Sequence, residues 1–105
     1  MRFYSLDKLI NLHDGYKKVI KIDEHHLLLV QLNGERHLIE SMCPHRGHPL
    51  TESDLNAESG RIRCPLHAYQ FDIVSGDLLH ATEEHCRSLK TYDLIYEGNE
   101  VGVML

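Results

Sequence analysis

Residues 43–50 read CPHRGHPL, and residues 64–72 read CPLHAYQFD. Each stretch brings a cysteine and a histidine close together, Cys43 with His45 and Cys64 with His67. Thiolates and imidazoles bind borderline and soft metals, and two ligand pairs on neighbouring loops can converge on one centre. The pattern C-x-H-x18-C-x2-H therefore predicts a metal site, for which zinc and iron–sulfur are the candidates.

The spacing of the ligands favours iron–sulfur over zinc. A structural zinc site more often has two cysteines or two histidines two to five residues apart, because both ligands of one knuckle wrap one ion. A 2Fe-2S cluster has two irons, so each loop can give its cysteine to one iron and its histidine to the other. Zinc stays open as the alternative metal.

The CPHRG motif at 43–47 and the CPLH motif at 64–67, followed by Phe71-Asp72, resemble the cluster-binding motifs of the Rieske 2Fe-2S family. The resemblance extends over essentially the whole chain, because strands are expected before the first motif and a hairpin after the second. It implies one Rieske-type 2Fe-2S cluster as the cofactor. It also implies an antiparallel β-sandwich with a small cluster-binding subdomain, at about 42–80, formed by two loops.

The resemblance further implies a role for each of the four ligands. Cys43 and Cys64 would ligate the inner iron, while His45 and His67 would hold the outer iron near the protein surface. The exposed imidazoles would then be the exit for the electron.

Departures from the respiratory and photosynthetic members of the family indicate a low reduction potential. In those members two further cysteines join the loops by a disulfide, whereas this chain has His48 and Leu66 at these positions. Hydroxyl groups after the second motif also donate hydrogen bonds to the cluster there, and this chain has Tyr69 and Phe71 instead. Phenylalanine cannot donate and tyrosine poorly replaces a small serine, so the reduced cluster should be less stabilised.

Short segments rich in β-branched, aromatic and leucine residues alternate with turn residues, which predicts an all-β fold. The expected strands are 16–22, 26–32, 35–41, 70–74, 88–96 and 101–105. Asn33-Gly34 is a strong two-residue hairpin signal between the second and third of them. A long loop is expected between Cys43 and Cys64. Residues 5–10 are expected to form either a short helical turn capped by Ser5 or a loop.

Composition limits the classes of function. The chain has 105 residues and a net charge of −5, so we expect one domain, 1–105, that binds neither nucleic acid nor an anionic membrane. No apolar run approaches the roughly 20 residues that span a bilayer, and the start MRFYSLDKLINL lacks a secretory signal pattern. We therefore expect a cytoplasmic protein. Three cysteines are an odd number, which argues against a disulfide framework and leaves Cys86 as an inert thiol.

Residues near the motifs receive simpler interpretations. His48 is expected as an exposed loop histidine, and Arg46 either hydrogen-bonds backbone or an acidic side chain or takes part in docking. Five acidic residues are expected to be solvated loop charges, with a field that steers a partner as the alternative: Glu52, Asp54, Glu58, Glu83 and Glu84.

Together these features predict a Rieske-type ferredoxin, a monomeric one-electron carrier that takes electrons from a reductase and passes them to a terminal oxygenase or similar enzyme. Such a protein is not itself an enzyme. An oxygenase large subunit needs a further mononuclear iron domain, for which 105 residues leave no room. The alternatives are the small subunit of an assimilatory nitrite reductase, against which the intact ligand set counts, and a redox- or iron-sensing module.

Overall fold

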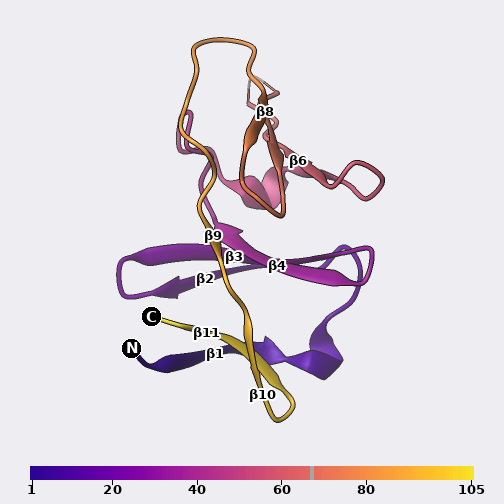
Figure 1. Ribbon diagram of the computed structural model, residues 1–105, viewed down its shortest axis with the longest axis vertical. Coiled ribbons are helices and arrows are strands. Elements are labelled where there is room, and N and C mark those ends of the chain that lie inside the picture. The colour runs from indigo at the N-terminus through magenta and orange to yellow at the C-terminus, as the bar shows by residue number, and fades with distance from the viewer. Residues whose placement is uncertain (67) are drawn as a thin grey trace.

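The computed structural model describes residues 1–66 and 68–105 and has three antiparallel sheets (Figure 1). The strands are β1 Phe3–Lys8, β2 Lys17–Ile22, β3 His25–Leu32, β4 Glu35–Glu40, β5 Asp54–Asn56, β6 Arg61–Arg63, β7 Gln70–Asp72, β8 Leu78–His80, β9 Thr91–Tyr92, β10 Ile95–Glu97 and β11 Glu100–Met104. Two single-turn 3-10 helices, η1 Leu9–Asn11 and η2 Leu50–Glu52, connect strands. The expected all-β antiparallel fold is confirmed. The predicted ligand His67 lies outside the described residues.

The three sheets form layers. The outer sheet has the order β1-β11-β10, the central sheet β2-β3-β4-β9, and the loop sheet β5-β6-β7-β8. Figure 1 shows the central sheet between the outer sheet, which holds both chain ends, and the region that carries the loop sheet. Within the part of the chain that the structure describes, no helix is long and apolar enough to cross a bilayer.

Strand β3 joins the two hydrophobic cores. Its residues Leu27 to Val30 are all fully buried, and successive side chains of a strand point to opposite faces. Leu27 and Leu29 pack in the core that the outer sheet completes, and Leu28 and Val30 pack in the core under the loop sheet. Burial of each such side chain stabilises the fold by about 1.5–3 kcal/mol, so this strand anchors both flanking layers.

The prediction of a turn at Asn33-Gly34 is confirmed, and three other local predictions are wrong. Asn33 and Gly34 have positive φ values of 53° and 79°, as a tight hairpin turn requires. The region around Ser5 is strand β1 rather than a helical turn, because pairing with β11 overrides local propensity. The expected loop from Cys43 to Cys64 contains β5 and β6, because β6 pairs with β7. The expected strand 88–96 is split into β9 and β10, which belong to different sheets.

The two sequence motifs form loops that close in the same way. The backbone N–H of Cys43 donates to the carbonyl of His48 at 2.9 Å, and that of Cys64 donates to the carbonyl of Tyr69 at 2.8 Å. In both loops the acceptor is the fifth residue after the cysteine. Each cysteine is therefore fixed at the start of a short closed loop, the first reached from β4 and the second from β6.

The fourth residue after each cysteine has a left-handed backbone. Gly47 has φ 73° and Ala68 has φ 58°, a region where a Cβ costs about 1–2 kcal/mol. A Cβ added at Gly47 would meet no atom within 4 Å, so a substitution there would cost backbone strain only. Glycine at position 47 thus spares the first loop the backbone strain that Ala68 imposes on the second loop.

We predict opposite effects of exchanging alanine and glycine at these positions. Gly47→Ala should lower stability by about 1 kcal/mol, and Ala68→Gly should raise it or leave it unchanged, because relief of strain outweighs the added freedom of the unfolded chain. Ala57→Gly, at an exposed loop residue without positive φ, is the matched control and should lower stability by about 0.4–1 kcal/mol. Thermal unfolding followed by circular dichroism measures all three. Equal losses from Ala68→Gly and Ala57→Gly would contradict the prediction.

Candidate metal centre

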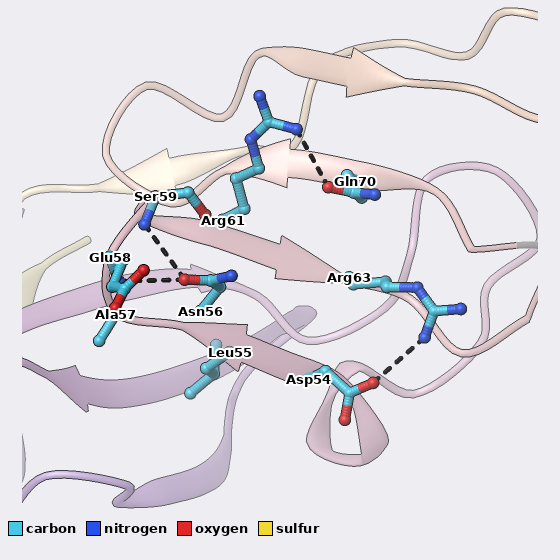
Figure 2. A pocket seen from close by; sticks show the side chains of 9 residues that line it. All are labelled: Asp54, Leu55, Asn56, Ala57, Glu58, Ser59, Arg61, Arg63 and Gln70. Carbon is cyan, nitrogen blue, oxygen red and sulfur yellow. Dashed lines mark hydrogen bonds and ion pairs between the residues drawn. The ribbon is translucent and has the colours of Figure 1, made fainter.

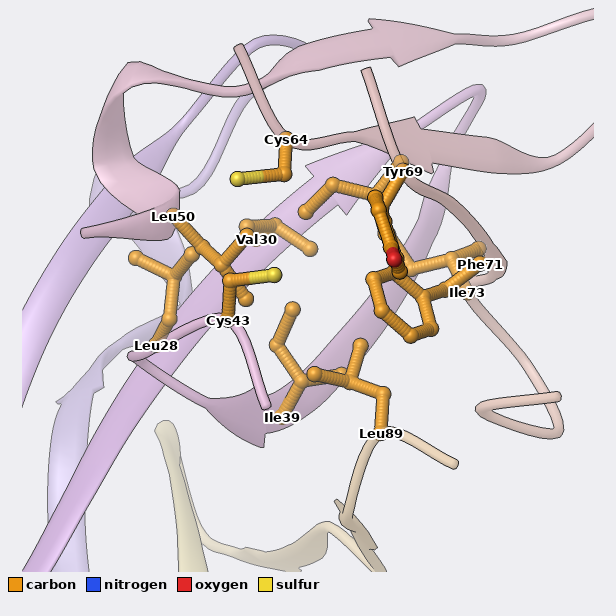
Figure 3. Packing of buried hydrophobic residues seen from close by; sticks show 11 residues of the cluster. Leu28, Val30, Ile39, Cys43, Leu50, Cys64, Tyr69, Phe71, Ile73 and Leu89 are labelled. Atoms are coloured by element: carbon orange, nitrogen blue, oxygen red, sulfur yellow. The ribbon is translucent and has the colours of Figure 1, made fainter. Parts of the chain in front are cut away.

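Two buried thiols face one another between the closed loops. Cys43 and Cys64 are 2% and 1% exposed, and Figure 3 shows their sulfur atoms pointing into the same space. Burial, assisted by the neighbouring Cys43 thiol, raises the pKa of Cys64. The apolar residues around the pair are Leu28, Val30, Ile39, Leu50, Ile62, Phe71, Ile73 and Leu89. Soft sulfur donors are thus held in a space from which water is excluded.

The ring of His45, two residues after Cys43, is covered. The ring stacks on that of Tyr69, with centroids 4.0 Å apart and planes 9° from parallel. Its Nε2 lies 3.4 Å from Oε1 of Glu83 and 3.7 Å from Oε1 of Glu84, and only 2% of the side chain is exposed. The expectation that this imidazole is exposed is therefore wrong, because Tyr69 and the two carboxylates flank it.

The segment of residues 81–90 between β8 and β9, the covering loop, brings those carboxylates to the site. The hydroxyl of Tyr69 donates a hydrogen bond to the backbone carbonyl of Glu84. Nη2 of Arg46 lies 3.8 Å from Glu83 and 3.7 Å from Glu84. Of the roles expected for Arg46, the structure shows pairing with acidic side chains. Glu83 and Glu84 are likewise more than solvated charges, because they pair with the first motif.

The other end of the covering loop is held by Glu40, the last residue of β4. Arg87 donates two hydrogen bonds to its carboxylate, at 2.6 and 2.7 Å, and the backbone N–H of Lys90 donates a third at 2.7 Å. The N–H of Leu89 donates to the carbonyl of Gly76, where a Cβ would lie 2.0 Å from the Leu89 oxygen. Sequence reasoning missed Glu40 and Arg87, because no local pattern links residues so far apart in the chain.

Cys86 and His48 were both expected not to be ligands, and the structure shows the contacts of each. Cys86 is partly buried and packs against the core that contains Cys43, and burial raises its pKa. His48 is not a freely exposed histidine, since its Nε2 lies 2.9 Å from Oε2 of Glu52. Glu52 itself is 65% exposed, as expected of a solvated charge, although it contacts His48.

One surface cavity has neither Cys43 nor Cys64 in its lining. It has a volume of about 530 Å³ and is lined by Asp54, Leu55, Asn56, Ala57, Glu58, Ser59, Arg61, Arg63 and Gln70 (Figure 2). Its two arginines are paired, Arg61 with Gln70 and Arg63 with Asp54, both at 3.2 Å. It contains no cysteine or histidine, so it offers no soft metal ligand.

The donor types that the structure brings together fit an iron–sulfur cluster. Within residues 1–66 and 68–105, no three histidine, cysteine or acidic side chains form a group that could hold a metal ion by themselves. The structure brings together the thiols of Cys43 and Cys64 and holds the ring of His45 against Tyr69, while His67 is not among the described residues. Two buried thiols with an imidazole beside them are the ligand types that a mixed Cys/His cluster requires.

Sequence comparisons identify relatives of two kinds. The chain is 32% identical over 91 residues to the ferredoxin component of the alkene monooxygenase system of Xanthobacter autotrophicus, covering 87% of this chain and 71% of that protein. It is 40% identical over 68 residues to apoptosis-inducing factor 3 of Mus musculus and Homo sapiens. That match covers 65% of this chain but only 11% of the longer protein, so the chain spans a small part of these relatives.

A solved structure agrees over nearly the full length. The ferredoxin of carbazole 1,9a-dioxygenase from Nocardioides aromaticivorans IC177 superposes with a TM-score of 0.84 at 25% identity, covering 98% of this chain and 97% of that one. The family model of the Rieske [2Fe-2S] domain matches residues 2–93. The chain therefore belongs to the Rieske [2Fe-2S] family, and membership of that family implies one Rieske-type 2Fe-2S cluster.

Proposed function

We propose that this chain is a Rieske-type ferredoxin, which carries one electron at a time from a reductase to a terminal oxygenase or similar enzyme. The observation that carries the proposal is the buried pair of Cys43 and Cys64 between two closed loops. The ferredoxin components among its relatives, and the full-length likeness to a dioxygenase ferredoxin, support the same role. The protein would then be an electron carrier and not itself an enzyme.

The ligand assignment is part of this proposal. Cys43 and Cys64 would hold the inner iron, and His45 and His67 the outer iron. The inward-facing thiols support the assignment of the two cysteines to the inner iron. Because both thiols must lose their protons to become ligands, cluster binding releases protons and stabilises the loops.

A cluster held by Cys43, His45, Cys64 and His67 would supply reversible one-electron transfer. The apolar side chains around Cys43 and Cys64 exclude water from the thiolates. Tyr69 supports the ring of His45 by stacking and directs its own hydroxyl to the Glu84 carbonyl. Since Phe71 has no donor, neither aromatic residue offers the hydroxyl that would stabilise a reduced cluster.

The proposal extends to the form of the protein. We propose that residues 1–105 make one domain, because β3 contributes alternate side chains to both cores and ties the layers together. A monomer suffices for the proposed role, since the ligand set lies within one chain. Three cysteines without a disulfide support a reducing compartment, the cytoplasm.

The partial match to a much longer protein favours a second candidate. A chain that spans 11% of apoptosis-inducing factor 3 has the size of one unit of a larger protein. The same one-electron chemistry would then serve a neighbouring domain rather than a separate oxygenase. The nitrite reductase small subunit and the sensing module remain further alternatives for the role of the cluster.

The first test of the proposal concerns the ligands. Purified protein should contain two irons and two sulfides per chain with a mixed Cys/His electron paramagnetic resonance spectrum. His45→Ala and His67→Ala should each abolish that spectrum, because each removes an imidazole from the outer iron. Cys86→Ser is the matched control and should keep it, since the four-ligand set is complete without Cys86. Stoichiometric zinc without iron, or cluster loss in the Cys86 variant, would overturn the assignment.

The second test concerns electron transfer. We expect a flavin-dependent ferredoxin reductase to reduce the protein with one electron per chain, and the reduced protein to be reoxidised by a Rieske oxygenase with substrate and oxygen. Stopped-flow absorbance at the cluster bands measures both steps. The His45→Ala variant is the control without transfer. Rapid reduction without reoxidation by any oxygenase of the ferredoxin-dependent type would favour the sensing module instead.

The third prediction is the reduction potential. It should lie in the lower part of the Rieske range of about −150 to +300 mV, near the negative end, because hydroxyl donors to the cluster are lacking. Tyr69→Phe should leave the potential nearly unchanged, since the Tyr69 hydroxyl is already committed to Glu84. Protein-film voltammetry measures both proteins. A wild-type midpoint reduction potential well above zero would contradict the proposal that the protein is a ferredoxin.

A further inference from the structure

The carboxylates of the covering loop lie against the proposed outer ligand, not merely near it. Oε1 of Glu83 is 3.4 Å and Oε1 of Glu84 is 3.7 Å from Nε2 of His45, whose side chain is 2% exposed. The ring of Tyr69 is stacked on the imidazole, with centroids 4.0 Å apart, and limits how far the imidazole can turn away from the carboxylates. A histidine that ligates a metal through one nitrogen commonly donates its other N–H to a carboxylate.

We propose that Glu83, assisted by Glu84, is a positioning residue that partners the outer nitrogen of His45 and lowers the reduction potential of the cluster. The inference rests on the proposed ligand role of His45. A carboxylate that accepts from an imidazole increases electron donation by the ring to the metal. Its negative charge also disfavours the addition of an electron nearby.

The two carboxylates should not contribute equally. The Glu83 side chain is 39% exposed and that of Glu84 is 70% exposed, so solvent screens Glu84 more strongly. Ion pairs between exposed groups contribute little, but here the partner His45 is buried, and charges act more strongly where water is excluded. We therefore assign the larger effect to Glu83.

Arg46 acts in the opposite direction. Its Nη2 lies 3.8 Å from Glu83 and 3.7 Å from Glu84, with the arginine side chain 54% exposed. The guanidinium offsets part of the negative charge beside His45. Arg46 therefore provides an independent test, because its removal leaves both carboxylates in place.

The experiment compares reduction potentials of the cluster-loaded protein at one pH and one ionic strength. Glu83→Gln should raise the equilibrium constant for reduction threefold to tenfold, which is ~28 to ~59 mV for one electron. The Glu83→Gln/Glu84→Gln protein should shift further in the same direction, and Glu83→Asp should restore most of the wild-type potential. Arg46→Gln should lower the potential. Glu97→Gln removes the same charge from exposed strand β10, at the other end of the molecule, and should have little effect.

Spectra separate failure of this inference from failure of the ligand assignment. If the wild-type protein lacks a mixed Cys/His spectrum, both are overturned. If the spectrum is present but the glutamine variants shift no more than Glu97→Gln, only the role of the carboxylates is overturned. Should the glutamine variants lose the cluster, Arg46→Gln still decides, because an unchanged or raised potential in that variant overturns the proposal.

Discussion

Burial of β3 on both faces is the constraint on which the rest of the molecule depends. A strand whose side chains Leu27 to Val30 are all excluded from water needs a covering layer on each face. The outer sheet supplies one layer, and the loop sheet with its two cysteine loops supplies the other. The space between Cys43 and Cys64 is thus an edge of a hydrophobic core, which explains how thiols come to be held without water.

The local chemistry of the chain could be predicted to a large extent. The ligand motifs, the Asn33-Gly34 turn and the central strands are encoded by neighbouring residues, and such signals survive folding. Pairings over long distances could not be predicted. Strand β1 forms because of β11, and the short β6 forms because of β7, against the turn-like composition around them. The unbroken apolar run LLLV at 27–30 did hold a signal for burial on two faces, since one-sided strands alternate.

The candidate site likewise has features that could be predicted from the sequence and features that could not. Its proposed donor atoms were predicted from motif spacing, but its surroundings come from the covering loop, whose contacts join Glu40 to Arg87 and Arg46 to Glu83. No sequence pattern indicates these pairs, because each joins charges that only the tertiary fold brings together. For this reason the burial of His45 could not be inferred. That both loops close in the same way could not be inferred either. The histidines follow their cysteines at different distances in the sequence, whereas the closing backbone hydrogen bond spans five residues in both loops.

The pairing of β1 with β11 has a consequence for the order in which the chain can assemble. Phe3 lies opposite Met104, whereas β2, β3 and β4 are joined by tight hairpins. Local contacts form early and non-local ones late. During synthesis on the ribosome the three-stranded meander can form while the strand that covers its Leu27 and Leu29 face is still missing. That apolar face then stays exposed to chaperones or to other nascent chains until β11 is synthesised and pairs with β1.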